Sequence, residues 1–241
     1  TGSSYASSTW TYSATYGTVA TSTDPMAKST GYIYDSYNLY PATTTNPLSQ
    51  KTATKFDYSS GKVATTTDPN GAVFATVYDG LDRVLVQKQT DIAAPTQQVS
   101  TVEFAYTDTA LPSVHQTKYL DGSTAVESYV YFDGFGRVLQ QRVEAEDGGD
   151  YMISDYAYNN RSLLAKESLP YFKNGSSKTS ATANNNLYQS YTYDPLGRVM
   201  AIQNAVGTTN KAYDDWLVTT TDARGKVKDL DYDAYGRLAT V

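Results

Sequence analysis

Residues 193–199 read YDPLGRV, and this heptapeptide has the composition of a β-hairpin turn. Asp194 can accept hydrogen bonds from the backbone ahead of it, and Pro195 supplies the φ of about −65° that the second position of a type I turn needs. Gly197 stands at the fourth position, where a type I turn closed by a one-residue bulge requires a positive φ. We therefore predict a hairpin tip here.

The heptapeptide recurs as YDGLDRV at 78–84, FDGFGRV at 132–138 and YDAYGRL at 232–238, with weaker copies at 34–38 and 158–164. Its first, second, fifth and sixth positions are the candidate site residues, and we interpret them as structural turn residues. They are Tyr78, Asp79, Asp82, Arg83, Phe132, Asp133, Gly136, Arg137, Tyr193, Asp194, Gly197, Arg198, Tyr232, Asp233, Gly236 and Arg237. Gly136, Gly197 and Gly236 are predicted to have positive φ, and so are Asn38 and Asp82, because Gly, Asn and Asp tolerate that region.

A second series of turn residues interleaves with the first. Asp24, Asn46 and Asp68 each follow Thr at intervals of 22 residues, and an aromatic-Asp pair lies 11 residues after each of them. A turn every 11 residues leaves strands of about seven residues. The chain is also rich in Tyr and Thr, which favour strands, and it lacks the apolar period of a helix. The predicted fold is all-β, one long antiparallel meander of hairpins that forms a curved or wound sheet.

Composition excludes several classes of function. The chain has 241 residues, a net charge of −6, one histidine and no cysteine. An acidic chain without a basic run has no electrostatic footprint for nucleic acid. It has no apolar stretch long enough to span a membrane, no disulfide framework and no His or Cys set for a metal cluster. We expect no cofactor and no metal site.

These turns resemble the YD repeat, also called the RHS repeat, whose unit is a Tyr-Asp-x-x-Gly-Arg-Leu/Val hairpin. The resemblance covers about residues 20–241 and is specific in the four best copies. SLPYF at 168–172, followed by the copy at 193–199, is similar to the stretch that joins the middle region to the RHS repeats in insecticidal toxin complex B components and SpvB-like proteins. The resemblance implies a wall segment of a hollow β-shell that encloses a toxic polypeptide.

The domain organisation follows from these patterns. Residues 1–22 are a Ser/Thr-rich lead-in, and an imperfect first repeat is the open alternative. Residues 23–241 form the YD/RHS repeat array, with a surface loop at about 173–187, where Ser, Thr, Asn and Lys predominate. The family's complete shells are several times longer and carry an autoproteolytic core that has no match here. We therefore expect the chain to be part of a longer protein.

The repeated charges allow a chemical and a structural interpretation. The Asp residues could be catalytic or Ca²⁺-binding carboxylates, but both functions need oxygens that converge in space. Spread over separate turns, the Asp residues are better explained as turn caps. Likewise, the four arginines that follow the turns could bind a carboxylate or sulfate, but each is expected to bond neighbouring carbonyls or an Asp, or to lie over a Tyr ring. They are Arg83, Arg137, Arg198 and Arg237.

The 23 tyrosines form the most informative surface. Rows of Tyr on a sheet face could bind sugars, whereas cross-strand packing is the structural interpretation. His115 has no Ser-His-Asp or metal context, and we expect it to be a solvated histidine. No residue is assigned a catalytic role, and the sequence favours a protein that is not an enzyme.

The predicted function is a non-enzymatic wall segment of a secreted or cell-surface toxin-type shell from a bacterium. The alternative is a carbohydrate-binding or adhesive repeat protein that uses its Tyr-rich faces. Expected partners are the remaining repeats or the toxin domain of a larger parent chain, with glycans as further candidates. Self-association is also expected, because the uncharged end segments at 12–20 and 239–241 would expose strand edges.

Overall fold

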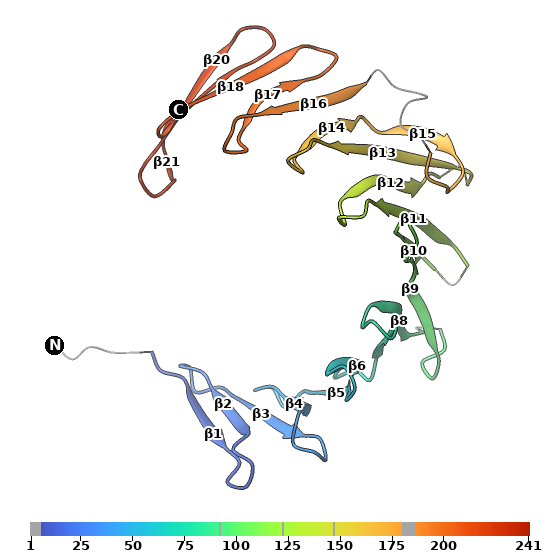
Figure 1. Ribbon diagram of the computed structural model, residues 1–241. Helices are drawn as coiled ribbons and strands as arrows, with labels where there is room; N and C mark the ends of the chain where they lie inside the picture. Colours follow the sequence, from blue (N-terminus) through green and yellow to red (C-terminus); the bar gives the residue numbers. More distant parts are fainter. Residues whose placement is uncertain (1–5, 92, 122, 147, 180–186) are drawn as a thin grey trace, which may run out of the picture. The chain divides into compact units, whose positions relative to one another are not determined.

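The computed structural model describes residues 6–91, 93–121, 123–146, 148–179 and 187–241. Over these residues the chain is all-β, with 21 strands and no helix. Successive strands pair antiparallel and are joined by short turns (Figure 1). The predicted class, an all-β antiparallel meander, is confirmed. Among the described residues there is no helix that is long and apolar enough to cross a membrane.

The chain divides into two compact units. The first comprises Thr1–Ala105 and Thr117–Ala125, and the second comprises Tyr106–Gln116 and Val126–Val241. The first unit contains β1 (Thr9–Tyr12), β2 (Val19–Thr23), β3 (Ser29–Tyr34), β4 (Pro41–Thr45), β5 (Lys51–Asp57), β6 (Lys62–Thr67), β7 (Val73–Tyr78) and β8 (Val84–Thr90). Two strands, β9 (Gln98–Thr107) and β10 (Ser113–Tyr119), have residues in both units.

The second unit contains nearly all the remaining strands. They are β11 (Ala125–Phe132), β12 (Val138–Glu144), β13 (Asp150–Tyr158), β14 (Leu164–Ser168), β15 (Tyr171–Asn174), β16 (Tyr188–Tyr193), β17 (Val199–Gln203), β18 (Thr208–Asp214), β19 (Leu217–Thr221), β20 (Val227–Tyr232) and β21 (Leu238–Thr240). Most are five to seven residues long, as expected from an 11-residue interval between turns.

One segment departs from the plain meander. The nine-residue strand β13 pairs with β14 through its C-terminal half and with β15 through its N-terminal half. Leu169 and Pro170 separate β14 from β15, and Pro lacks the N–H that a continuous ladder would use. Because β16 pairs with β14 rather than with β15, β15 is a side branch of the sheet (Figure 1).

The lead-in and the start of the predicted loop both contain strands. Within the lead-in, β1 pairs with β2, and β2 pairs with β3, so its described part continues the sheet. At the predicted loop of 173–187, β15 includes Lys173 and Asn174, so the loop starts later than expected. Residues 180–186 of that loop and residues 1–5 of the lead-in lie outside the described residues, and the domain boundaries stay predictions.

The core is small because the strands form a single layer. Among the described residues, the buried apolar side chains are Tyr131, Tyr151 and Ile153, all on β11 or β13. Buried polar side chains gather in the same region. They are Gln140, Arg142, Asp155, Ser168 and Asp194. Elsewhere most strand residues are half-buried. Contacts within turns and between neighbouring strands therefore stabilise much of this fold, in place of a thick core.

Candidate functional site

Each of the four heptapeptides forms a closed turn around its Asp. In the turn after β16, Asp194 N–H donates to the Arg198 carbonyl at 2.9 Å and Gly197 N–H donates to the Asp194 carbonyl at 3.0 Å. Oδ1 of Asp194 accepts the Arg198 N–H at 2.8 Å, and Oδ2 accepts Arg198 Nε at 2.6 Å. The same Asp–Arg bond, at 2.7 Å, joins the pair in the other three turns. These pairs are Asp79–Arg83, Asp133–Arg137 and Asp233–Arg237.

The backbone has the conformation that the turn composition predicts. Gly136, Gly197 and Gly236 have φ values of 77°, 86° and 74°, and Asn38 and Asp82 have 57° and 63°. The strand register shifts by one residue at the aromatic residue before each Asp, as a bulge requires. The positive φ predicted at these five positions is therefore confirmed.

The turn bonds hold the Asp residues ionised. At Asp79, hydrogen bonds from the Arg83 backbone N–H and side chain lower the pKa of the carboxyl below its usual value. At Asp233, the Arg237 backbone N–H and side chain do the same. Since one oxygen accepts backbone N–H groups and the other accepts Arg Nε, these carboxylates are engaged in their own turns. In the structure, each set of predicted residues thus closes its own turn.

A repeated contact connects the turns of Arg137 and Arg198 to the next hairpin. The Arg137 guanidinium lies 4.6 Å from the ring centroid of Tyr158, and Arg198 lies 4.3 Å from that of Tyr213. Lys62 takes the same place 5.0 Å from the Tyr78 ring. We call this contact, of a basic side chain after one turn with the Tyr ring of the next hairpin, the stacking step. It links neighbouring hairpins by a cation–π attraction.

A hydrogen bond accompanies every stacking step. The hydroxyl of Tyr158 donates to the Val138 carbonyl at 3.0 Å, and that of Tyr213 donates to the Val199 carbonyl at 3.0 Å. In both cases the acceptor is the residue directly after the stacked Arg. Tyr78 bonds the Val63 carbonyl in the same way, at 3.1 Å. The Tyr of one hairpin therefore contacts the hairpin before it twice, through the basic side chain and through a backbone carbonyl.

The second unit contains a buried arginine on β12. Arg142 on β12 has no exposed side-chain surface, and its Nε donates to Gln140 Oε1 at 2.8 Å. One terminal nitrogen donates to the Gly175 carbonyl, and the other donates to Thr179 Oγ1 at 2.8 Å. Gly175 and Thr179 belong to the segment 175–179, which follows β15. Arg142 thus fastens this segment onto the sheet.

The polar network continues from Gln140 to β13. Gln140 Nε2 donates to Asp155 Oδ1 at 2.5 Å, and the Tyr171 hydroxyl donates to Asp155 Oδ2 at 2.7 Å. Burial, and then the hydrogen bond to the negative Asp155, raise the pKa of Tyr171 to about 12. Every buried side-chain polar atom that the structure describes has a hydrogen-bond partner. Sequence reasoning missed this network, because Arg142 and Gln140 lie outside the repeated heptapeptides.

The structure corrects the interpretation of His115. Its ring stacks on Tyr129, with centroids 4.2 Å apart and planes inclined by 1°, so it is packed rather than freely solvated. His115 Nε2 lies 3.7 Å from Glu127 Oε2, which also accepts the hydroxyls of Tyr129 and Tyr151 at 3.0 and 3.2 Å. The physical reason is strand alternation, which places Glu127 and Tyr129 on one face of β11 beneath the histidine.

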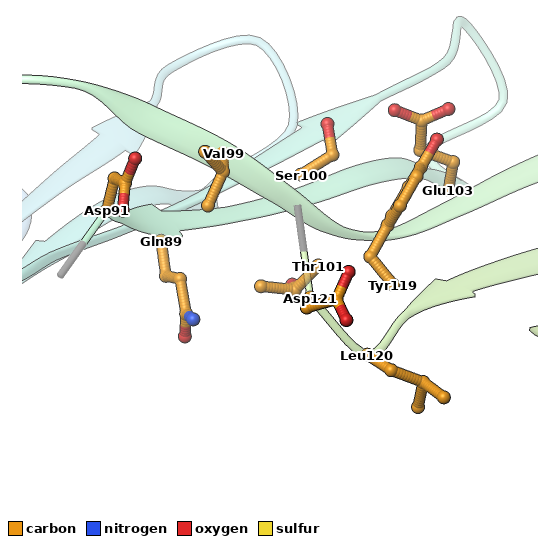
Figure 2. A pocket seen from close by; sticks show the side chains of 9 residues that line it. All are labelled: Gln89, Asp91, Val99, Ser100, Thr101, Glu103, Tyr119, Leu120 and Asp121. Atoms are coloured by element: carbon orange, nitrogen blue, oxygen red, sulfur yellow. The ribbon is translucent and has the colours of Figure 1, made fainter. Parts of the chain in front are cut away.

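The first unit contains an open cavity of about 470 Å³ between β8, β9 and the end of β10 (Figure 2). Three carboxylates line it, those of Asp91, Glu103 and Asp121, and its other polar side chains are uncharged. Figure 2 shows the Tyr119 hydroxyl directed toward Glu103, with which it forms a hydrogen bond. The ring of Tyr119 is the one aromatic ring among the residues that line this cavity.

Two of the three carboxylates of this cavity, those of Asp91 and Asp121, are already used in turns. Asp91 Oδ1 accepts the Ala93 N–H at 2.8 Å, and Asp121 Oδ1 accepts the N–H groups of Ser123 and Thr124 at 2.8 and 2.6 Å. Hydrogen bonds from Ser123 and Thr124 lower the pKa of Asp121 to about 2. Over the part of the chain that the structure describes, no three His, Asp or Glu side chains come together in a way that could hold a metal ion.

Comparison with solved structures finds this arrangement of strands in bacterial toxin complexes. The crystal structure of TcdB2-TccC3 matches with a TM-score of 0.78 and 16% identity over 97% of this chain. TcdB2-TccC3 without its hypervariable C-terminal region matches with a TM-score of 0.79 and 13% identity, also over 97%. The Tc holotoxin pore of Photorhabdus luminescens gives 0.76 and 12% over 92%. The chain has the fold of these toxin proteins.

The match confirms, at the level of the fold, the resemblance to YD-repeat proteins and toxin complexes. The chain spans only 15% to 17% of the length of the toxin chains that it matches. In sequence, a family described as a domain of unknown function (DUF6443) matches residues 103–215, which include the Arg142 network and two of the four heptapeptides. No curated protein matches the sequence.

Proposed function

We propose that the chain is a non-enzymatic structural array, one wall segment of a toxin-type shell that encloses a polypeptide cargo. The observation that carries this proposal is the match of 92% to 97% of the chain to Tc toxin structures, of which it spans 15% to 17%. A segment with these proportions fits a role as one part of a much larger sheet. The same likeness supports a secreted or surface location in a bacterium.

The chemistry of the turns supports a structural role. The four Asp–Arg pairs close their turns, Arg137 and Arg198 also take part in stacking steps, and the buried Arg142 fastens a neighbouring segment. Carboxylates engaged in this way are poor candidates for general acid or base chemistry, which needs a group free to exchange a proton with substrate. The half-buried apolar residues of a single-layer sheet also favour a face that is covered in a larger assembly.

The test is protease protection in the full-length protein that contains this chain. We expect the enclosed polypeptide to resist trypsin in the intact protein and to become sensitive after the sheet is unfolded by denaturant. Cryo-electron microscopy of the same sample should place this segment in a closed wall around additional density. A polypeptide cleaved equally fast in both states, or a sheet without enclosed density, would contradict the proposal.

Carbohydrate binding is a second candidate function, which the cavity next to Tyr119 favours. A glycan array of the chain, with Tyr119→Ala as the matched variant, separates it from the structural role. Sugar binding that disappears in Tyr119→Ala would establish a binding function at the cavity. Equal, weak signals from both proteins would remove this candidate.

A further inference from the structure

The segment 175–179 is held on the second unit by side chains of the sheet. Five hydrogen bonds join it to three buried side chains, those of Tyr131, Gln140 and Arg142. The preceding strand β15 ends at Asn174, and no residue of the segment belongs to a strand. The sheet therefore binds this segment much as a protein binds a separate peptide.

Four of the five bonds go to the main chain of the segment. The Tyr131 hydroxyl donates to the Ser176 carbonyl at 2.7 Å, and Arg142 donates to another carbonyl of the segment. The Gln140 side-chain amide bonds both backbone groups of Thr179, because it donates to the carbonyl at 3.1 Å and accepts the N–H at 3.2 Å. Main-chain bonds of this kind give affinity with little regard to side chains.

The fifth bond goes to a side chain, that of Thr179. Its Oγ1 accepts a bond from Arg142 at 2.8 Å, and the three bonds of the guanidinium within the described residues all go to uncharged oxygens. Asp155 is connected to Arg142 through Gln140 rather than directly. A guanidinium away from water bonds most strongly to a carboxylate, whose two oxygens match its N–H groups. The Thr179 position therefore favours an acidic side chain over a hydroxyl.

The segment can leave the sheet without unpairing strands. It has no large apolar side chain, and Ser177 at its middle is exposed. Gly175 at its start has a φ of 88°, so the chain turns there at a residue with wide backbone freedom. The pairs of β13 with β12 and β15 do not include residues 175–179. Regions with few apolar contacts are the first to open in local unfolding.

We propose that Tyr131, Gln140 and Arg142 form a peptide-binding site, for which the segment 175–179 is the ligand that the chain itself supplies. The preferred ligand is a short peptide with an acidic side chain at the position of Thr179. Its carboxylate replaces the hydroxyl at Arg142, and its main chain replaces the segment at Tyr131 and Gln140. All these residues belong to the second unit, and the inference does not depend on the proposed shell.

The first experiment adds synthetic peptides to the full chain. One peptide copies residues 174–179 with Thr179→Asp, and the matched control has Thr179→Asn, which keeps the shape without the charge. Sodium acetate is the probe for a site that binds simple anions only. Amide exchange of residues 175–179 and the NMR resonance of the Arg142 Nε–H report displacement of the segment.

We expect the acidic peptide at about 5 mM to accelerate exchange of residues 175–179 by about ten-fold, because the attached segment competes at an effective concentration in the mM range. The Arg142 resonance should shift, and exchange in β12 and β13 should stay unchanged. The control peptide and acetate should have neither effect. If the acidic peptide has no effect, or if acetate acts as well as the peptide, the proposal is overturned.

The second experiment places the carboxylate in the chain itself. Thr179→Asp should slow exchange of residues 176–178 by about ten-fold relative to Thr179→Asn, and it should prevent the acidic peptide from acting. Ser177→Asp is the control for charge alone, because Ser177 is exposed and Arg142 bonds Gly175 and Thr179 instead. Equal or faster exchange in Thr179→Asp than in Thr179→Asn would refute the preference for a carboxylate and overturn the proposal.

Discussion

The guanidinium of Arg137 lies 4.6 Å from the ring centroid of Tyr158, a residue of the next YD hairpin. The Tyr158 hydroxyl in turn bonds the Val138 carbonyl, so the two hairpins are joined by a cation–π contact and a hydrogen bond at one point. This relationship explains why a turn motif recurs along a sheet with a small core. The Asp closes the turn and bonds the Arg side chain, and the Arg guanidinium then contacts the Tyr ring of the next hairpin.

The stacking step should contribute to stability only where the second ring is present. We expect Arg137→Ala to lower the free energy of unfolding by about 1–2 kcal/mol, because it removes a partly desolvated cation–π contact. Arg237→Ala, the matched variant, removes only exposed contacts and should stay within about 0.5 kcal/mol of the parent chain. Urea unfolding followed by circular dichroism measures both. Equal losses in the two variants would contradict the stacking step.

Two glycines of one turn test the bulge. Gly136 has a φ of 77°, whereas Gly134 has an ordinary φ, and a Cβ at either would meet no atom within 4 Å. Gly136→Ala should therefore cost about 1–2 kcal/mol of backbone strain. Gly134→Ala should be neutral, or should stabilise the fold by at most about 0.4–1 kcal/mol, because alanine restricts the unfolded chain. Thermal unfolding gives the comparison, and the reverse ranking would refute the turn assignment.

The local features of the fold were predictable, and the long-range ones were not. Asp133 and Gly136 predict their turn because both of its features depend on a few neighbouring residues. These features are the hydrogen bond from the Arg137 N–H to the Asp133 carboxylate and the positive φ of Gly136. Arg142, by contrast, meets Gly175 and Thr179 across 33 and 37 residues. Those contacts depend on the pairing of β14 and β15 with the two halves of β13. A single sequence contains no direct signal of the register of these strand pairs.

The same reason explains the error at His115. Its contact with Tyr129 depends on the alignment of two strands rather than on neighbours in sequence. The cavity at Tyr119 was also missed, since its carboxylates come from separate parts of the sequence, Glu103 within β9 and Asp91 and Asp121 after β8 and β10. The one signal in the sequence was the spacing of Glu127 and Tyr129, because residues two apart in a strand lie on the same face of the sheet.

Arg142 should hold the segment 175–179 in place. We expect Arg142→Met to cost about 3 kcal/mol, because it leaves the part-buried Gly175 carbonyl without this donor and removes the Arg142 hydrogen bonds to Thr179 Oγ1 and Gln140 Oε1. Amide exchange of residues 175–179 should accelerate more than exchange in β17–β18. The control is Arg224→Met, since Arg224 is 87% exposed and its Nε lies 3.8 Å from Asp222. An unchanged exchange rate of the segment in Arg142→Met would contradict the fastening role.

The second unit should lose stability in alkali. Burial and the bond to Asp155 raise the pKa of Tyr171 to about 12, and burial and the Glu127 charge raise that of Tyr151. An unfolded tyrosine ionises near pH 10, so this stabilisation is complete below about pH 10 and is lost as the pH rises toward 12. Unfolding free energies measured from pH 8 to 12 should fall less steeply in Tyr171→Phe. Parallel curves for the two proteins would show that Tyr171 is not responsible.

The most direct measurement of hairpin coupling is a double-mutant cycle on Arg198 and Tyr213, whose guanidinium carbon and ring centroid are 4.3 Å apart. Unfolding free energies are compared for the parent chain, Arg198→Ala, Tyr213→Ala and the double variant. If hairpins are joined through stacking steps, the two losses should be non-additive, with a coupling energy of about 1 kcal/mol. Losses that add to within about 0.3 kcal/mol would contradict the account, because each hairpin would then be stable independently of the contact that we hold to join them.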